Sequence, residues 1–179
     1  MKDGFIKVAA VTPKIRVADP EYNRKKIMEK IEEAEKERAV VVVFPELCIT
    51  GYTCGDLFFQ EPLLEEAQEV CRRLCAAGCG RVIATRGSAG ALYYDGADFF
   101  RQPPDPVEPV DTLGAGDSFA TAFLLSFLES LERAGERMAA DRPLYEEEVR
   151  AALRRGAAFA AKTCLVQGAF GHGKAFLPE

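Results

Sequence analysis

The chain has 179 residues, of which 48% are hydrophobic, and it carries a formal net charge of −5 with a pI near 5.1. A chain of this length and apolar content can bury a substantial core, which excludes an intrinsically disordered protein. The acidic balance argues against a basic nucleic-acid-binding face, and no apolar run reaches the ~20 residues that a membrane span needs. Because the N-terminus also lacks the long apolar stretch of a secretory signal, we expect a cytoplasmic protein.

The first part of the chain alternates predicted strands and helices. The continuous apolar runs "FIKVAAV" (5–11) and "VVVVFPEL" (40–47) are typical of buried strands. Between them Asp19 can cap a helix, and Pro20 suits its first turn. A second helix is expected over residues 62–78.

Short strands and two long helices are predicted for the rest. Turns that contain glycine divide residues 81–102 into three strands. An apolar helix is expected from Gly114 to Gly135, and an Ala-rich helix over residues 145–165, before an irregular tail over 166–179. This order predicts a single three-layer α/β/α unit with a mainly parallel sheet plus a β-hairpin.

Three of the six cysteines recur every four residues along one side of the second predicted helix: Cys71, Cys75 and Cys79. The only histidine is His172, and the spacing matches no common zinc or iron–sulfur pattern. Because a free cysteine usually behaves as a small apolar residue, we expect a buried helix face rather than a metal cluster.

The stretch "VDTLGAGDSF" places Gly114, Ala115 and Gly116 where a loop enters an apolar helix. The unpaired N–H groups and the positive dipole end of a helix start attract anions, and the absence of bulky side chains lets a phosphate approach. A carboxylate at Asp117 is costly beside such a site unless it has a task, such as accepting the proton of a hydroxyl that attacks phosphorus. The simpler alternative is an ordinary helix start that Asp117 or Ser118 caps.

The longer string "DTLGAGDSF" closely resembles the C-terminal signature of PfkB-type, or ribokinase-like, sugar kinases, and the resemblance runs from about residue 70 to the end. The stretch "VIATRGSAGALYYDG" is similar to the strand and hairpin ahead of that family's nucleotide site. The stretch "GAAFAAKTCLVQGAFGHGKAF" is similar to its closing helix and adenine-side loop, most of all in fructosamine-type kinases. The resemblance implies an ATP-dependent phosphotransferase that acts on a sugar hydroxyl, with Mg²⁺ accompanying the ATP phosphates.

The same resemblance implies roles for individual residues. Asp117 matches the catalytic base, and the amides of residues 114–116 match the anion hole for the transferring phosphoryl group. Asp111 and Thr112 match the start of the signature, near which many members hold a monovalent cation. The segment that flanks ATP and the adenine-side loop correspond to Thr85, Arg86, Gly87 and Gly168.

Members of that family are considerably longer than this chain. Their first half supplies the sugar-binding residues, an early Gly-rich signature and a lid sheet, none of which is recognisable here. We therefore expect a partial kinase that keeps the ATP-side, phosphate-binding half and has little or no turnover, since orientation of the reactants can contribute ~7–11 kcal/mol to lowering a barrier.

The stretches "IKVAAVTPKIRVADPEYNRKKI" and "VVVFPELCITGYTCGDLFFQ" resemble the nitrilase superfamily, most closely the glutaminase part of glutamine-dependent NAD synthetases. The resemblance covers about residues 1–68 and implies that Glu46 matches the catalytic glutamate, the general base for a cysteine nucleophile. The family's lysine and cysteine lie far downstream, and Cys48 and Cys54 are too close to Glu46 in sequence to match that nucleophile. The alternative is a structural acid at a strand end.

We therefore expect a chimera-like chain built from two fused partial domains, a nitrilase-like segment (1–68) and a PfkB-like segment (69–179). Seven lysines precede residue 70 and only Lys162 and Lys174 follow, which also indicates two source sequences. Three functions stay open: a partial kinase, a nucleotide- or anion-binding module without chemistry, and an engineered or fragment-fusion chimera with no selected activity. A remnant of a nitrilase-type glutamine amidase comes last.

The expected partners follow from the same resemblances. They are a nucleotide and a sugar, and neither a nucleic acid nor a membrane is expected. Because two partial cores can leave apolar surface uncovered, a homodimer stays open.

Overall fold

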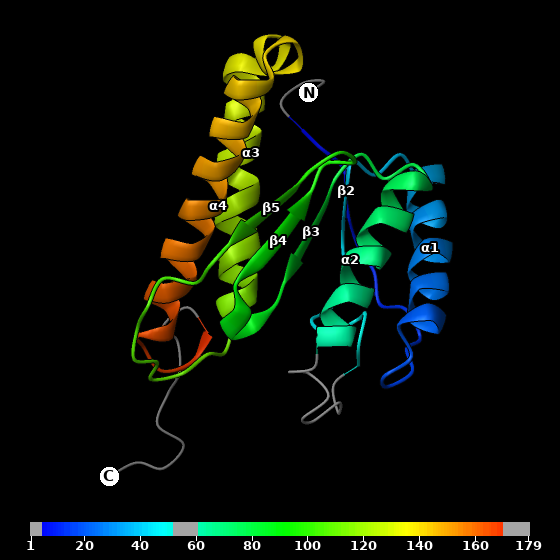
Figure 1. Ribbon diagram of the computed structural model, residues 1–179, viewed down its shortest axis with the longest axis horizontal. Coiled ribbons are helices and arrows are strands. Elements are labelled where there is room, and N and C mark those ends of the chain that lie inside the picture. Colours follow the sequence, from blue (N-terminus) through cyan, green and yellow to red (C-terminus); the bar gives the residue numbers. More distant parts are fainter. Residues whose placement is uncertain (1–4, 52–60, 170–179) are drawn as a thin grey trace. The chain divides into compact units, whose positions relative to one another are not determined.

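The computed structural model describes residues 5–51 and 61–169, without the side chains of residues 61–67. The chain divides into two compact units, with the boundary between Val82 and Ile83 (Figure 1). The mixed α/β class is confirmed, but each unit has its own small sheet, where the sequence predicted a single three-layer unit. The difference arises because hydrophobic periodicity identifies strands without specifying which of them pair. Among the described helices, none has the length and apolar character to cross a membrane.

The first unit contains a β-α-β arrangement followed by one more helix. The first two strands pair in parallel, with Val8 opposite Val41, so the helix between them is the crossover connection that a parallel pair requires. The elements in chain order are β1 (Val8–Ala10), α1 (Pro20–Lys36), β2 (Val41–Val43) and α2 (Glu61–Ala76).

The start of α1 is fixed by two polar side chains. The Asp19 carboxylate accepts a hydrogen bond from the Tyr22 amide at 3.0 Å, which confirms the predicted cap. The side chain of Asn23 is fully buried and binds the backbone of Arg16 through both its oxygen and its nitrogen. Its nitrogen also donates to the Ile49 carbonyl at 2.8 Å, so α1 holds both loops that follow the strands.

The core of the first unit lies mainly between its two helices. Ile27 of α1 packs with Val70 and Leu74 of α2. The strand residues Val8 and Val43 remain 52% and 41% exposed, although the sequence predicted strands covered on both sides. A two-stranded sheet is too narrow to bury both of its faces, so this unit depends on the contact between α1 and α2.

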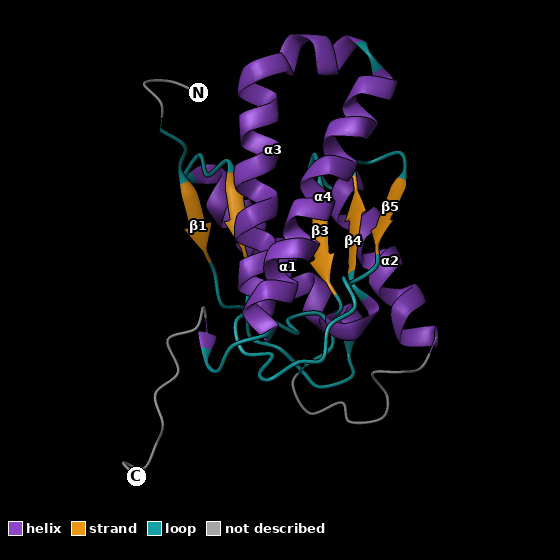
Figure 2. Cartoon of the chain, turned by 90° about the vertical axis from the view of Figure 1, so that its left-hand side faces the viewer, coloured by secondary structure: helices purple, strands orange, loops and turns teal. Residues whose placement is uncertain are grey.

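The second unit is a three-stranded sheet with two long helices on one face. The strands lie in the order β3-β4-β5, and β4 and β5 form the predicted antiparallel hairpin with Leu92 opposite Arg101. The two helices run side by side (Figures 1 and 2). The elements are β3 (Val82–Thr85), β4 (Ala91–Tyr94), β5 (Phe99–Gln102), α3 (Ala115–Ala140) and α4 (Arg142–Cys164).

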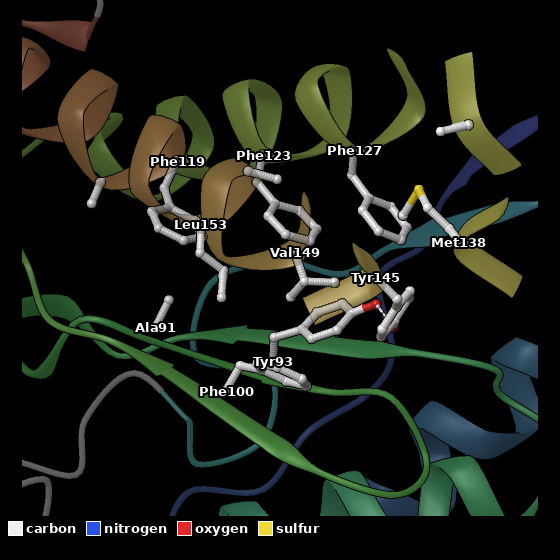
Figure 3. Close-up of a cluster of buried hydrophobic side chains, with 13 residues drawn as sticks. Ala91, Tyr93, Phe100, Phe119, Phe123, Phe127, Met138, Tyr145, Val149 and Leu153 are labelled. Atoms are coloured by element: carbon white, nitrogen blue, oxygen red, sulfur yellow. Dashed lines mark hydrogen bonds between the residues drawn. The ribbon is translucent and has the colours of Figure 1, made fainter. Parts of the chain in front are cut away.

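Aromatic side chains fill the core of the second unit (Figure 3). The rings of Phe123 and Phe127, one helical turn apart on α3, stack with centroids 5.7 Å apart. Tyr93 of β4 lies against both rings, and its hydroxyl forms a buried hydrogen bond of 2.8 Å with the Tyr145 hydroxyl of α4. Both tyrosine hydroxyls are therefore satisfied, and the helices are joined to the sheet by both apolar and polar contacts.

The helix α3 is longer than the sequence predicted. It continues past Gly135 to Ala140, with a kink where Ala134 adopts φ −141° and ψ 20°. The chain then turns at Asp141, whose carboxylate accepts a hydrogen bond from the Leu144 amide at 3.1 Å and caps α4. Asp141 is thus the single residue that separates the two helices.

We predict that Gly156→Ala destabilises the second unit. A Cβ atom at Gly156 of α4 would lie 3.0 Å from a ring carbon of Phe119 and 3.1 Å from the Phe119 carbonyl oxygen. Because backbone cannot yield as a flexible side chain does, we expect a loss of about 1–3 kcal/mol in the free energy of unfolding, measured by urea denaturation.

The matched control is Gly135→Ala on α3, where a Cβ atom meets nothing within 4 Å. There the replacement should leave the stability unchanged or raise it by about 0.5–1 kcal/mol, because alanine loses less backbone entropy in a helix. Equal effects of the two substitutions would contradict the close contact between α3 and α4 at Gly156.

Candidate functional site

The start of α3 leaves backbone amides free. Gly114 adopts the left-handed conformation, with φ 80°, and its carbonyl accepts the first helical hydrogen bond, from the Ser118 amide at 2.9 Å. The Ala115 amide donates to the Thr112 carbonyl. Within the described residues, the amides of Gly116 and Asp117 have no acceptor. This is the arrangement that the Gly-Ala-Gly sequence predicted for an anion-accessible helix start.

Neither side chain that could have capped this helix does so. Asp117 is exposed and forms no hydrogen bond or ion pair with any described residue. Ser118 is buried, and its hydroxyl lies 2.7 Å from the Thr163 hydroxyl of α4. The ordinary capping alternative is therefore wrong, and the Asp117 carboxylate remains available beside the free amides.

The carboxyl end of β3 lies next to the same helix start. A Cβ atom built on Gly116 would have the Thr85 Oγ1 atom at 3.8 Å as its nearest neighbour. The next residues, Arg86 and Gly87, lead into a 3₁₀ turn, in which Gly87 has φ 53°. The structure thus brings Thr85 to the Gly-Ala-Gly turn, as expected if both flank one ligand.

The carboxylate of Asp111 braces the loop that precedes α3. Its Oδ1 atom accepts from the Leu113 amide at 3.0 Å, and its Oδ2 atom accepts from the Gly168 amide at 2.9 Å. These hydrogen bonds, first the one from Leu113, lower the pKa of Asp111. The Val110 amide donates to the Cys164 carbonyl at 2.8 Å, so the loop is tied to the end of α4.

The two predicted cation positions differ in their surroundings. Asp111 binds the amide of Gly168, the predicted adenine-side residue, whereas Thr112 is exposed. Within the described ranges there is no group of three or more His, Cys, Asp or Glu side chains that could hold a metal ion. Both Asp111 carboxylate oxygens already accept hydrogen bonds from backbone N–H groups. A monovalent cation at Asp111 and Thr112 stays a prediction.

Glu46 lies in the turn after β2 and is exposed. Burial raises the pKa of the nearby Cys48 thiol to about 11, so this thiol stays protonated at neutral pH and is a poor nucleophile. Cys54 lies outside the described residues. The first unit therefore places Glu46 at a strand end without an activated thiol among the residues that the structure describes.

The cysteine series is apolar in character, with Cys71 and Cys75 on α2 and Cys79 just after its end. Cys71 is fully buried, and burial raises the pKa of its thiol to about 11. Cys75 and Cys79 are partly buried, and Cys79 packs against the Ile27 cluster. The predicted buried helix face is confirmed for Cys71.

An α/β unit with a bare helix start at the end of a strand is typical of phosphate-binding proteins. Residues 55–171 match the pfkB family of carbohydrate kinases, and residues 7–102 match the carbon-nitrogen hydrolase family. Each match covers more than half of the chain. The chain therefore belongs to the pfkB carbohydrate kinase family and, through its overlapping N-terminal part, to the carbon-nitrogen hydrolase family.

Individual relatives show the same division. Fructoselysine 6-kinase of Shigella flexneri is 35% identical over 114 residues, which are 63% of this chain and 38% of the kinase. Glutamine-dependent NAD(+) synthetase of Mycobacterium leprae is 33% identical over 66 residues, 37% of this chain and 10% of the synthetase. The chain thus spans well under half the length of either relative, and the resemblance to two families that the sequence indicated is confirmed.

The fold is similar to that of a solved kinase. The crystal structure of phosphofructokinase-2 from Escherichia coli, in complex with potassium, has a TM-score of 0.55 at 19% sequence identity. The similarity covers 91% of this chain and 52% of that kinase. It supports the α/β fold class.

We predict that Asp111→Asn destabilises the chain in a pH-dependent manner. The folded-state pKa of Asp111 lies below its ordinary value of 3.8, so the ionised carboxylate stabilises the fold above that pH and loses this effect as the pH falls through the lowered pKa. The difference in unfolding free energy between parent and variant should be largest at neutral pH and shrink in acid. Urea denaturation across this range measures it.

The control for this experiment is Asp105→Asn, a substitution at an exposed position of the same loop. It should leave the stability unchanged at every pH. A constant difference between Asp111→Asn and the parent, from neutral to strongly acidic pH, would show that the charge of Asp111 contributes nothing.

We also predict slow alkylation of Cys48. A pKa of about 11 in place of 9.0 lowers the thiolate fraction on the order of 100-fold, and the thiolate is the reactive form. Mass spectrometry after iodoacetamide treatment near neutral pH should show Cys48 modified far more slowly than an unstructured cysteine peptide. Modification of Cys48 at the rate of the peptide would refute the burial of this thiol.

Proposed function

We propose that the second unit binds the phosphates of ATP at the start of α3, as the ATP-side part of a PfkB-type sugar kinase. The observation that carries this proposal is the pair of amides at Gly116 and Asp117, which have no described acceptor and start a helix of 26 residues. A helix start concentrates partial positive charge, and bare amides can donate directly to phosphate oxygens.

The surroundings of these amides fit a phosphate group. Among the described residues, the Thr85 hydroxyl is the nearest group to the position that a Cβ atom on Gly116 would take, at 3.8 Å, so none of these residues crowds the turn there. In this proposal Thr85, Arg86 and Gly87 flank the nucleotide, and Gly168 lies on its adenine side. Mg²⁺ would be bound chiefly by the ATP phosphates and would neutralise their charge.

Asp117 is proposed as the catalytic base. Its carboxylate is exposed and has no partner among the described residues, so it can accept the proton of a sugar hydroxyl. As that hydroxyl oxygen forms a bond to the γ-phosphorus, the bond from the γ-phosphorus to the bridging oxygen breaks and ADP leaves. General-base catalysis of this kind contributes about 10²–10⁴-fold to a rate.

Binding of the acceptor sugar is the step that this partial kinase supports least. The chain covers 38% of the fructoselysine 6-kinase that it matches, and the pfkB family match begins at residue 55. Groups that orient an acceptor contribute ~7–11 kcal/mol, so we expect ATP binding with slow or no transfer. An ATP-binding module without chemistry is the second candidate, and the same free amides favour it.

We further propose that the seam between the two family segments lies near residue 68, within α2. The overlap of the two family matches over residues 55–102 supports a seam in this region. Residues 1–68 would then be nitrilase-like and residues 69–179 kinase-like. Glu46 would be the catalytic glutamate inherited from the first family, with no amidase activity because Cys48 is a poor nucleophile.

We predict that Mg²⁺-ATP raises the melting temperature of the parent protein and that Gly116→Glu removes this shift. The new carboxylate would lie at the helix start, where the positive end of the helix dipole stabilises a negative charge, so the variant should fold normally. The same carboxylate would repel phosphate. Thermal unfolding with and without nucleotide measures both effects. No stabilisation of the parent at millimolar ATP would refute the proposed nucleotide site.

The catalytic proposal is tested with Asp117→Asn and with fructoselysine as the acceptor. This variant should keep the ATP-dependent rise in melting temperature and lose any ADP formation that fructoselysine stimulates, by about 10²-fold or more. Asp105→Asn serves as the matched control and should retain both. Equal turnover in Asp117→Asn and the parent would leave only the ATP-binding module.

A further inference from the structure

One side chain joins the loop before α3 to the chain that follows α4. The Asp111 carboxylate accepts a hydrogen bond from the Leu113 amide at 3.0 Å through Oδ1, and one from the Gly168 amide at 2.9 Å through Oδ2. The first donor is two residues away in the sequence and the second is 57 residues away. Asp111 therefore links a local turn to a segment that comes after both long helices.

Backbone hydrogen bonds place the same two parts of the chain side by side. The amides of Val110 and Asp111 donate to the carbonyl of Cys164, the last residue of α4, at 2.8 and 3.3 Å. Gly168 adopts φ 76°, in the left-handed region that favours glycine. The chain after α4 thus turns at Gly168, where its amide meets the Asp111 carboxylate.

The loop that carries Asp111 leads directly into the free amides of α3. Asp111 lies three residues before Gly114, which precedes the first residue of the helix. The amides of Gly116 and Asp117, in the first turn, have no acceptor among the described residues. One carboxylate therefore sets where the chain after α4 lies relative to the glycine turn.

We propose that Asp111 is a positioning residue, which holds residues 165–168 where the nucleoside part of ATP binds. This inference rests on the proposed function, in which the phosphates bind the amides of α3 and Gly168 lies on the adenine side. A segment that is already in place before the ligand arrives need not be ordered on binding, so the affinity is higher. If the segment were in place in only about a tenth of the molecules, the apparent affinity for ATP would fall about 10-fold.

The link between Asp111 and Gly168 is a direct hydrogen bond. Asp111 is also a predicted cation position, and an ion could join the same two parts of the chain. A distance of 2.9 Å between the Gly168 nitrogen and Oδ2 is that of an ordinary N–H···O hydrogen bond, which has no ion between its atoms. In this proposal the positioning therefore requires no cation.

Two ligands separate the phosphate part of the site from the nucleoside part. Tripolyphosphate has three linked phosphates and no nucleoside, so it should bind the amides of α3 and gain nothing from residues 165–168. Calorimetric titration of the full chain with Mg²⁺-ATP and with Mg²⁺-tripolyphosphate gives the ratio of the two affinities. In Asp111→Asn this ratio should fall about 10-fold, because asparagine keeps one acceptor oxygen for Leu113 but directs an N–H donor at the Gly168 amide. The lost negative charge affects both ligands alike and cancels from the ratio.

Two variants serve as matched controls. Tyr145→Phe removes a buried hydrogen bond elsewhere in the second unit, and Asp105→Asn removes an exposed carboxylate from the same loop as Asp111. Both should keep the ratio of the parent. The fall in Asp111→Asn should persist when tetramethylammonium replaces K⁺ in the buffer.

The outcomes distinguish this inference from the proposed function. Binding of both ligands by the parent, with an unchanged ratio in Asp111→Asn, would overturn the role of Asp111 alone. A fall that occurs only with K⁺ present would also overturn it, because an ion would then make the link. Failure of the parent to bind either ligand would refute the proposed function, and with it this role.

A measurement on the parent makes the test independent of how well Asp111→Asn folds. In the ¹⁵N-labelled full chain, Mg²⁺-ATP should shift the amide resonances of both Gly116 and Gly168. Mg²⁺-tripolyphosphate should shift chiefly that of Gly116. A Gly168 resonance that ATP leaves in place, while that of Gly116 moves, would contradict the proposal.

Discussion

The hydroxyl pair of Ser118 and Thr163 joins the start of α3 to the end of α4, and the proposed chemistry depends on this contact. Because the Ser118 hydroxyl lies 2.7 Å from Thr163, it does not cap its own helix. The Asp111 carboxylate, in the loop before α3, also accepts a hydrogen bond from the Gly168 amide, which follows α4. These contacts hold the two helix ends together. They leave the amides of Gly116 and Asp117 without an acceptor in the described part of the chain. The proposed phosphate site therefore depends on the packing of α3 on α4 as much as on the glycine turn itself.

The two units differ in how complete their cores are. The second unit has a continuous aromatic core between sheet and helices, with Tyr93 at its centre (Figure 3). In the first unit, α1 packs against Val70 and Leu74, which lie where the two family matches overlap. The core of the β-α-β segment is therefore completed by a helix that both family matches include.

Much of the fold could be predicted from the sequence because its signals are local. The cap at Asp19, the hairpin of β4 and β5, and the Gly-Ala-Gly helix start all depend on residues within a few positions of one another. The continuation of α3 past Gly135 was missed because glycine usually ends a helix, whereas here the chain kinks at Ala134 and continues.

The remaining features depend on contacts between distant residues. The pairing of Ser118 with Thr163 and that of Tyr93 with Tyr145 join parts of the chain that no short pattern relates. The division into two units has the same origin, since strand pairing is decided by the whole chain. The sequence therefore indicated the candidate site residues, while the fold determined which of them lack a partner in the described part of the chain.

The kink at Ala134 separates the long helix into a functional part and a distal part. At 1.5 Å per residue, about 27 Å of helix lie between Gly116 and Ala134. Beyond the kink, Met138 is the last buried apolar side chain before the chain reverses at Asp141. This tip is consequently where the scaffold can best accept foreign peptide, a reporter group or a graft that lengthens the helical hairpin, without disturbing the glycine turn at the other end.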